Sequence, residues 1–271
     1  MTEVTQSTVT AFFDRESEMG RRLLPDPATV SGLGSYRKYE QAASMMAEPG
    51  VRDALDVGCN RGSIEYLFHS LFGAKSGAKR IEGVDVSEKA IEQARELALP
   101  NCTFRSYDGS RLPFGDAEFD LAVLVEVLEH VPNKKELLGE ISRVLRPGGR
   151  LFLTTPNPFC WALRAELGTW RQLRRLFRRP AIAKDLFVSI RDLVELLHEA
   201  GFSVPDPESL YSWPHLYFFF LGWSVVPPLP PKALTRYQSY CVRALGRRRL
   251  PEWLSRRLHW TLSGVVTKSN G

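Results

Sequence analysis

Short hydrophobic runs alternate with helical patterns between residues 52 and 155. Strands of a parallel sheet read as brief, β-branched or aromatic runs separated by amphipathic helices, so this alternation predicts βαβ units and an α/β fold. A last strand is predicted near the C-terminus, at 261–267. The five earlier strands are predicted at 53–57, 80–85, 102–107, 119–125 and 150–155.

Three helices are predicted from their ends. Ser87 is the expected N-cap of the first, and Ser189 with Asp192 gives a start similar to a capping box for the third. Gly201 is expected to end the third helix, because glycine readily adopts the left-handed conformation found after helix C-termini. The second helix precedes Pro147-Gly148-Gly149 and carries the apolar stripe Leu137, Leu138, Ile141, Val144 and Leu145.

Two stretches, 157–184 and 212–259, do not follow the alternation and are interpreted as cap or substrate insertions. The regular core is then expected to comprise 46–211, apart from the first insertion, and 260–271. Residues 1–45 are expected to form a helical flank or lid.

Composition narrows the class of protein. With 271 residues, 44% hydrophobic and 25% charged, the chain is typical of a globular protein and unlike a disordered, collagenous or coiled-coil chain. The first twenty residues contain no apolar run of signal-peptide length, so a cytoplasmic protein is expected. The cysteines are too far apart for a short zinc motif or a small disulfide framework: Cys59, Cys102, Cys160 and Cys241.

The glycine-bearing turn that follows the first strand is the main candidate for ligand chemistry. Asp56-Val57-Gly58-Cys59-Asn60-Arg61-Gly62 leads from a hydrophobic strand into an apolar helix, which aims free backbone N–H groups at an anion. A tight turn without a ligand is the alternative. Asp85, at the end of the second strand, can accept hydrogen bonds from both hydroxyls of a ribose, and Asp108 follows the third strand, within reach of an adenine amino group.

Five ordered segments carry a resemblance to a known family: DVGCNRG, GVDVS, YDGSRLPFGDAEFD, LVEVLEHV and LRPGGRLFLTTPN. In this order they resemble the motifs of class I S-adenosylmethionine (SAM) dependent methyltransferases, including the type 11 and ubiquinone-pathway O-methyltransferases. The resemblance implies SAM as cofactor. It also implies a Rossmann-like seven-stranded sheet of order 3-2-1-4-5-7-6, in which the run 262–267 supplies the antiparallel seventh strand.

The resemblance further implies which residues hold the cofactor. Asn60 stands where the family often has a second glycine, and the turn is expected to survive because asparagine tolerates the left-handed region. A nicotinamide-binding Rossmann domain is the competing interpretation, but the spacing is not G-x-G-x-x-G. The cofactor residues are predicted to be Asp56, Gly58, Asn60, Gly62, Asp85, Val86, Asp108, Gly109, Val125 and Glu126.

Catalytic groups are expected directly after the fourth strand, because ligands of open α/β sheets bind at the carboxyl ends of the strands. His130 is the candidate general base, and Glu129 is expected to orient its ring. A histidine that only supports the strand or the SAM pocket is the alternative. Glu126, Glu129 and His130 also resemble a cluster associated with a divalent metal in ubiquinone-pathway enzymes, so Mg²⁺ or Zn²⁺ binding is an alternative to carboxylates that are merely solvated.

The two insertions indicate which kind of molecule accepts the methyl group. Net charge is −4 over residues 1–150 and +9 over 151–271, and residues 170–179 form a predicted basic amphipathic helix. Residues 209–231 carry no formal charge and are rich in aromatic side chains, but prolines interrupt the run, so it is too short to span a bilayer. These features predict a hydrophobic or lipid-like acceptor, methylated at oxygen, and contact of 170–179 and 211–257 with an anionic membrane.

Alternative functions remain at this point. The segment 170–179 is also compatible with an ordinary surface helix, and the aromatic segment with the core of a cap. The basic half fits an RNA methyltransferase, although no nucleic-acid-binding motif is found and nucleic acid is not the expected partner. A SAM-binding or membrane-peripheral module without catalytic turnover is a third interpretation. The oligomeric state is not predicted.

If the basic helix contacts anionic lipid, replacing Arg174, Arg175 and Arg178 by Gln should release the protein, because each basic residue near such a surface contributes about 1 kcal/mol. Sedimentation with neutral and anionic vesicles measures this. The wild type is expected to sediment preferentially with anionic vesicles and the triple variant is not. Equal sedimentation of both proteins with both vesicles would contradict the prediction.

Overall fold

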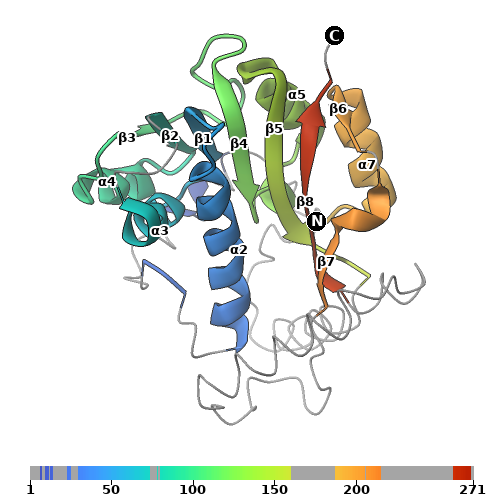
Figure 1. Ribbon diagram of the computed structural model, residues 1–271, viewed down its shortest axis with the longest axis horizontal. Coiled ribbons are helices and arrows are strands. Elements are labelled where there is room, and N and C mark those ends of the chain that lie inside the picture. Colours follow the sequence, from blue (N-terminus) through green and yellow to red (C-terminus); the bar gives the residue numbers. More distant parts are fainter. Residues whose placement is uncertain are drawn as a thin grey trace.

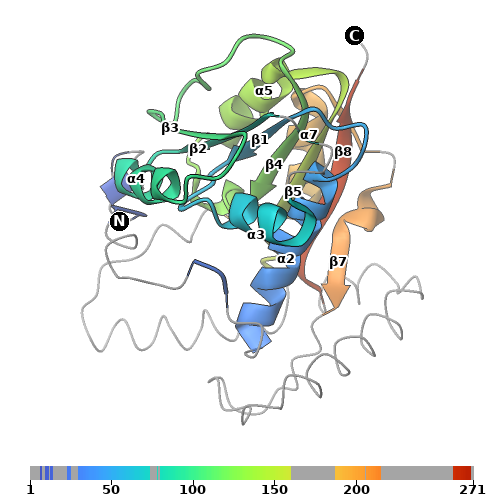
Figure 2. The ribbon, with the colours of Figure 1, turned by 60° about the vertical axis from the view of Figure 1, so that its left-hand side comes forward.

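The computed structural model describes residues 30–73, 80–159, 187–204, 206–214 and 259–269, together with 23–25, Ala78 and five residues near the N-terminus. A central sheet lies between two layers of helices (Figures 1 and 2). The expected basic helix at 170–179 and most of the segment 211–257 lie outside the described residues.

The sheet has the order β3-β2-β1-β4-β5-β8-β6, and β7 pairs with β8 beside this path. Strands β1 to β5 are parallel, whereas β8 runs antiparallel to β5. Since β8 occupies the position of the seventh strand, the expected order 3-2-1-4-5-7-6 is confirmed. The bounds are β1 Asp53–Val57, β2 Arg80–Asp85, β3 Cys102–Ser106, β4 Phe119–Val125, β5 Leu145–Pro156, β6 Phe202–Ser203, β7 Tyr211–Pro214 and β8 His259–Lys268.

Alternate residues of the central strands serve two hydrophobic cores, as the two-residue period of a strand requires. Leu55 of β1 and Leu124 of β4 belong to the core shared with α5 and α7, whereas Ala54 and Leu121 belong to the core shared with α2 and α3. The helices are α2 Val30–Met46, α3 Ser63–Phe72, α4 Glu88–Glu96, α5 Lys134–Val144 and α7 Ile190–Glu199, with short 3₁₀ turns at Leu128–His130 and Pro207–Leu210.

The predicted starts of the first and third helices, and the end of the third, are confirmed. The hydroxyl oxygen of Ser87 accepts a hydrogen bond from the Ala90 N–H, and that of Ser189 accepts one from the Asp192 N–H. Each bond satisfies one of the unpaired N–H groups of a helix start. Gly201 follows α7 with φ of 82°, the left-handed conformation expected there.

Some strand boundaries differ from the prediction. β3 ends at Ser106 rather than at residue 107, and Leu145 begins β5 instead of continuing the preceding helix. Leu145 pairs with Phe119, and pairing resumes regularly at Arg150 with Leu121. The residues between them, including Gly148 with φ of 73°, form an irregular start to the strand. A pattern of apolar residues cannot distinguish this start from the end of a helix.

Both ends of the second expected insertion belong to the sheet. Tyr211–Pro214 forms β7, and His259 is the first residue of β8. In this antiparallel pair Tyr211 lies opposite Leu262 and Pro214 opposite His259. The prolines and aromatic residues at this point obscured the alternation that would have predicted a strand.

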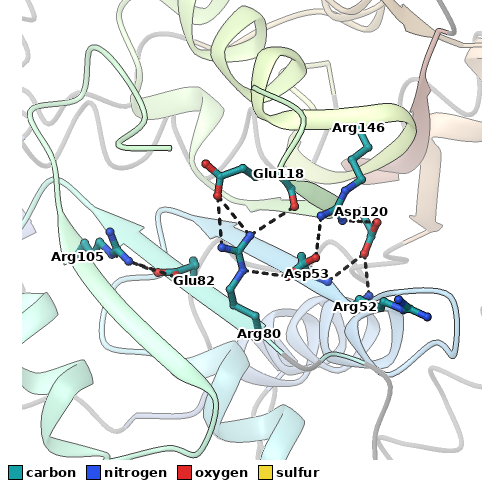
Figure 3. A network of polar contacts seen from close by, with 8 residues as sticks. All are labelled: Arg52, Asp53, Arg80, Glu82, Arg105, Glu118, Asp120 and Arg146. Atoms are coloured by element: carbon teal, nitrogen blue, oxygen red, sulfur yellow. Dashed lines mark hydrogen bonds and ion pairs between the residues drawn. The ribbon is translucent and has the colours of Figure 1, made fainter. Parts of the chain in front are cut away.

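A network of ion pairs joins the amino ends of the strands (Figure 3). Arg80 contacts Asp53 at 2.9 Å and Glu118 at 3.3 Å, while Arg146 contacts Asp53 at 2.9 Å and Asp120 at 2.6 Å. Exposed pairs contribute roughly 0 to 1 kcal/mol each, so their effect is chiefly to align the strands. These charged side chains at the amino edge of the sheet are thereby paired with one another.

None of the helices in the described part of the chain is both long enough and apolar enough to cross a membrane.

Candidate functional site

The carboxyl ends of β1 and β4 border a cavity of about 400 Å³. A crevice at this edge is where open α/β sheets bind their ligands. Residues from the N-terminal part of the chain, Leu23–Pro25 and Tyr39, line its other side. Among the expected cofactor residues, Gly58, Asn60 and Val125 line the cavity directly.

The turn after β1 requires glycine at its first position. Gly58 has φ of 82°, and its N–H donates to the Val84 carbonyl at 2.7 Å. A methyl group added here would lie 2.3 Å from Cγ2 of Val127, which is closer than two non-bonded carbon atoms can approach. Asn60 has φ of 50° and Gly62 has φ of 74°, which confirms that asparagine accommodates the left-handed conformation and that the turn is kept.

Asp85 connects this turn to the end of β2. Its Oδ2 accepts a hydrogen bond from the Asn60 N–H and its Oδ1 one from the Ser87 N–H, each at 2.9 Å. Burial raises the pKa of Asp85, and these N–H donors oppose the rise. Each carboxylate oxygen has two lone pairs, so both oxygens can accept a further hydrogen bond from a ligand hydroxyl.

The residues after β3 lie apart from the cavity lining. Asp108 is exposed and accepts hydrogen bonds from the Ser110 N–H at 2.9 Å and the Ser110 hydroxyl at 2.6 Å, which lower its pKa. Gly109 has φ of 82° and turns the chain here. Val86 and Asp108 do not line the cavity that borders Gly58.

Two carboxyl groups are buried below the turn. Asp56 on β1 is 1% exposed and Glu65 on α3 is 0% exposed. No N–H or hydroxyl group of the described residues donates a hydrogen bond to either of them. Burial, together with the charge of Glu65, raises the pKa of Asp56 well above its ordinary value, and burial raises the pKa of Glu65 to about 7.

Glu126, directly after β4, has an uncommon backbone conformation and a carboxylate held by two partners. Its backbone has φ of 57°, uncommon for a residue with a side chain and often found at functional sites. Its carboxylate contacts the ammonium of Lys38 at 2.9 Å and accepts a hydrogen bond from the Thr154 hydroxyl at 2.9 Å. This arrangement fixes the position of a charged group at the edge of the site.

Sequence reasoning missed Lys38, which comes from α2 and is only 6% exposed. A signal for it exists. Lys38, Ala42 and Met46 recur every four residues and therefore share one helical face, and the two apolar members are fully buried. A lysine in line with buried residues is expected to reach a partner, because an unpaired buried charge is costly.

Glu129 and His130 are adjacent but not hydrogen-bonded to each other. The Nε2 atom of His130 lies 3.8 Å from Oε1 of Glu129, longer than a hydrogen bond. Glu129 accepts a bond from the Thr155 hydroxyl at 3.2 Å, and burial, with the charge of Glu126, raises its pKa to about 8. Near neutral pH Glu129 is therefore largely protonated. The ring of Phe13 meets the His130 ring edge to face, at 5.2 Å between centroids.

The metal alternative does not fit this geometry. In the part of the chain that the structure describes, no three His, Cys, Asp or Glu side chains come together as ligands. Glu126 is already paired with Lys38 and Thr154, and Glu129 with Thr155. These contacts direct the two carboxyl groups to separate partners rather than toward one shared ligand position.

Comparison with known proteins gives a consistent result. Residues 55–153 match the model of the methyltransferase domain family. A demethylmenaquinone methyltransferase from Staphylococcus aureus is 30% identical over 175 residues, which cover 61% of this chain and 68% of the relative. A 27-O-demethylrifamycin SV methyltransferase from Amycolatopsis mediterranei is 34% identical over 142 residues, which cover 49% of this chain and 50% of the relative.

Solved structures agree at the level of the fold. A putative methyltransferase from Haloferax volcanii, solved in complex with the Trm112 methyltransferase activator, superposes with a TM-score of 0.58. Its sequence is 19% identical, and the match covers 95% of this chain and 97% of the other. The chain spans about half the length of several curated relatives that it matches.

The raised pKa of Glu129 predicts a pH dependence of stability. Between about pH 4.5 and 8 the folded protein holds a proton that the unfolded chain has lost, so this group makes stability fall as pH rises, by at most about 1.4 kcal/mol per pH unit. Glu129→Gln removes the contribution. Urea unfolding at several pH values should show a flatter profile for the variant. Parallel profiles for the two proteins would contradict this.

Proposed function

The chain belongs to the class I SAM-dependent methyltransferases, and we propose that it transfers the methyl group of SAM to an oxygen atom of a hydrophobic small-molecule acceptor. The observation that carries the proposal is the turn Gly58–Gly62, held by Asp85 at the cavity edge of the sheet. The relative from Amycolatopsis mediterranei is named for methylation at an oxygen, which supports the choice of acceptor atom.

The residues of the turn fit SAM. Gly58 lines the cavity, and glycine is required there because a side chain would overlap Val127. Backbone N–H groups at the start of α3 face the same edge, and the carboxylate of Asp85 can accept the ribose hydroxyls through its free lone pairs. Asp108 and Gly109 follow β3 and would meet the adenine, with Val86 beside the ribose.

The chain's own contribution to catalysis is positioning and proton removal. When bound, SAM would supply a methyl group on a sulfonium sulfur. In-line attack of the acceptor oxygen on the methyl carbon would break the carbon–sulfur bond and leave the thioether S-adenosylhomocysteine. Holding the two reactants in line lowers the barrier by about 7 kcal/mol or more in favourable cases. Leu23–Pro25 and Tyr39 cover the cavity and limit the access of water.

His130 takes the proton of the acceptor hydroxyl in this proposal. It lies in the turn Leu128–His130 that follows β4, and the Phe13 ring packs edge to face against its imidazole. Glu129 is protonated near neutral pH and contacts Thr155, so it supports the turn that carries His130 rather than supplying a negative charge.

The proposals for the methyl acceptor and for the location of the protein in the cell rest on sequence patterns. The uncharged aromatic run and the basic residues at 170–179 support a hydrophobic, lipid-like acceptor and a protein attached to the inner face of a membrane in the cytoplasm.

Replacing Asp85 by Ala should weaken SAM binding by about 1 to 3 kcal/mol, because two hydrogen bonds to a charged acceptor are lost. Calorimetric titration with SAM measures this, with Asp116→Ala, an exposed carboxylate away from the cavity, as the control that keeps wild-type affinity. Thermal unfolding of each protein separates loss of affinity from loss of fold. Unchanged affinity in the Asp85 variant, or tighter binding of NADH than of SAM, would contradict the cofactor assignment.

His130→Ala should lower kcat about 100-fold to 10,000-fold and leave SAM affinity nearly unchanged, because proton transfer acts in the transition state. The measurement is kcat against pH, with SAM affinity determined alongside. A histidine with only a structural role would instead lose thermal stability or SAM binding together with activity. Wild-type kcat in the variant, with an acceptor that needs deprotonation, would remove His130 from catalysis.

A further inference from the structure

A hollow in the surface lies away from the cofactor cavity. It has a volume of about 430 Å³ and is bordered by β2, by β3 and by the loop that joins β3 to β4. None of the described residues that border it also lines the cavity at the turn of Gly58. The surface hollow is therefore a separate place on the protein, to which the proposed function gives no role.

The surface hollow is positively charged in a half of the chain that is otherwise acidic. Its charged side chains come from neighbouring strands and from the adjoining loops (Figure 3): Arg80, Glu82, Arg105, Arg111 and Glu118. Three arginines against two glutamates leave one positive charge in excess, whereas residues 1–150 as a whole carry a net charge of −4. A local excess of positive charge in a hollow attracts anions.

Two of the three arginines keep hydrogen-bonding capacity for a ligand. Arg105 contacts Glu82 only at 3.3 and 3.4 Å, whereas charge-assisted hydrogen bonds are usually about 2.7 to 2.9 Å long. Arg111 acts electrostatically on Glu140, yet its guanidinium forms no ion pair with a described residue. The Arg105 side chain is 48% exposed and Arg111 is exposed as well, so an anion can reach the N–H groups of both.

The loop beside the surface hollow is anchored to α5. Arg143 donates hydrogen bonds to the carbonyl groups of Leu112 and Phe114, at 3.2 and 2.9 Å. Glu140 accepts one from the Leu112 N–H at 3.0 Å. The Phe114 ring packs edge to face against Phe119, with 4.9 Å between the ring centroids. The shape of the hollow is thus set before a ligand binds, which lowers the cost of binding.

One wall of the surface hollow is apolar. Leu112, Pro113 and Phe114 border it. The guanidinium of Arg105 lies over the Phe114 ring, 5.6 Å from the ring centroid, and this cation–π contact holds the charged group beside the apolar wall. A ligand that carries an anionic group next to a planar ring matches both features.

We propose that the surface hollow binds a small aromatic phosphate. The phosphate group accepts hydrogen bonds from Arg105 and Arg111, and the ring packs against Phe114. A guanidinium presents paired N–H groups that match two phosphate oxygens. Two guanidinium groups suit a phosphate monoester, which carries about 1.5 to 2 negative charges near pH 7, better than a carboxylate with one. The proposal is independent of the proposed function, because no residue of the cofactor site takes part.

Calorimetric titration of the whole protein with phenyl phosphate tests the proposal, and inorganic phosphate and phenol serve as the two separate parts of this probe. The wild type should bind phenyl phosphate at one saturable site, about tenfold more tightly than inorganic phosphate, because the ring adds apolar contact. Phenol lacks the charged group and should show no saturable binding.

Variants locate the site. Arg111→Gln should weaken the binding of both phosphates about tenfold, because charge-assisted hydrogen bonds are lost. Phe114→Leu should weaken the binding of phenyl phosphate alone. Arg95→Gln is the matched control: Arg95 is also an exposed arginine, at 49%, but it lies on α4 and does not border the surface hollow, so this variant should keep wild-type affinity. Thermal unfolding of each variant separates loss of affinity from loss of fold.

Four results would overturn the proposal. They are no saturable binding of phenyl phosphate by the wild type, wild-type affinity in Arg111→Gln, equal affinity for phenyl phosphate and inorganic phosphate, and competition with S-adenosylhomocysteine. Saturating S-adenosylhomocysteine should leave the affinity for phenyl phosphate unchanged, whereas competition would place the probe in the cofactor cavity. Failure of S-adenosylhomocysteine itself to bind would contradict the proposed function and leave this proposal standing.

Discussion

The two hydrogen bonds that Asp85 accepts are the constraint on which the site depends. They join the Asn60 N–H of the turn after β1 to the Ser87 N–H at the start of α4, each at 2.9 Å. A carboxylate bound by backbone donors resists rotation, so the turn keeps its left-handed conformations at Gly58 and Asn60 and the two strand ends stay in register. The ligand edge is thereby organised before a ligand binds, which lowers the cost of ordering it later.

The N-terminal part of the chain completes the site from the other side. The Ser87 hydroxyl donates to Asp14 at 2.6 Å and the Ser63 hydroxyl donates to the Leu23 carbonyl at 2.7 Å. Lys38 of α2 reaches Glu126 after β4. The functional groups come together at the carboxyl ends of the strands. These three contacts join the N-terminal residues to the segments that follow β1, β2 and β4. Changes in this flank are thus expected to affect ligand binding as well as stability.

The sequence was informative where local chemistry decides the structure. Ser87 acts through a hydrogen bond to the Ala90 N–H three residues on, and Asn60 and the glycines act through their own backbone conformations, so these roles could be read from neighbouring residues. Leu145 was misassigned because strand pairing with Phe119 overrode its helical spacing. The ion pair of Lys38 with Glu126 joins different elements, and the burial that raises the pKa of Asp56 and of Glu65 exists only after folding. The roles of the cofactor residues remain predictions.

Hydrogen exchange with and without S-adenosylhomocysteine tests the central claim most directly, namely that the turn held by Asp85 is the cofactor site. The account predicts slower exchange of the amides in residues 58–66 and 85–87, and unchanged exchange around Arg105 and Phe114, which border a separate hollow of the surface. Protection around Arg105 and Phe114 with none in the turn would contradict it, because the ligand would then bind away from the carboxyl edge of the sheet.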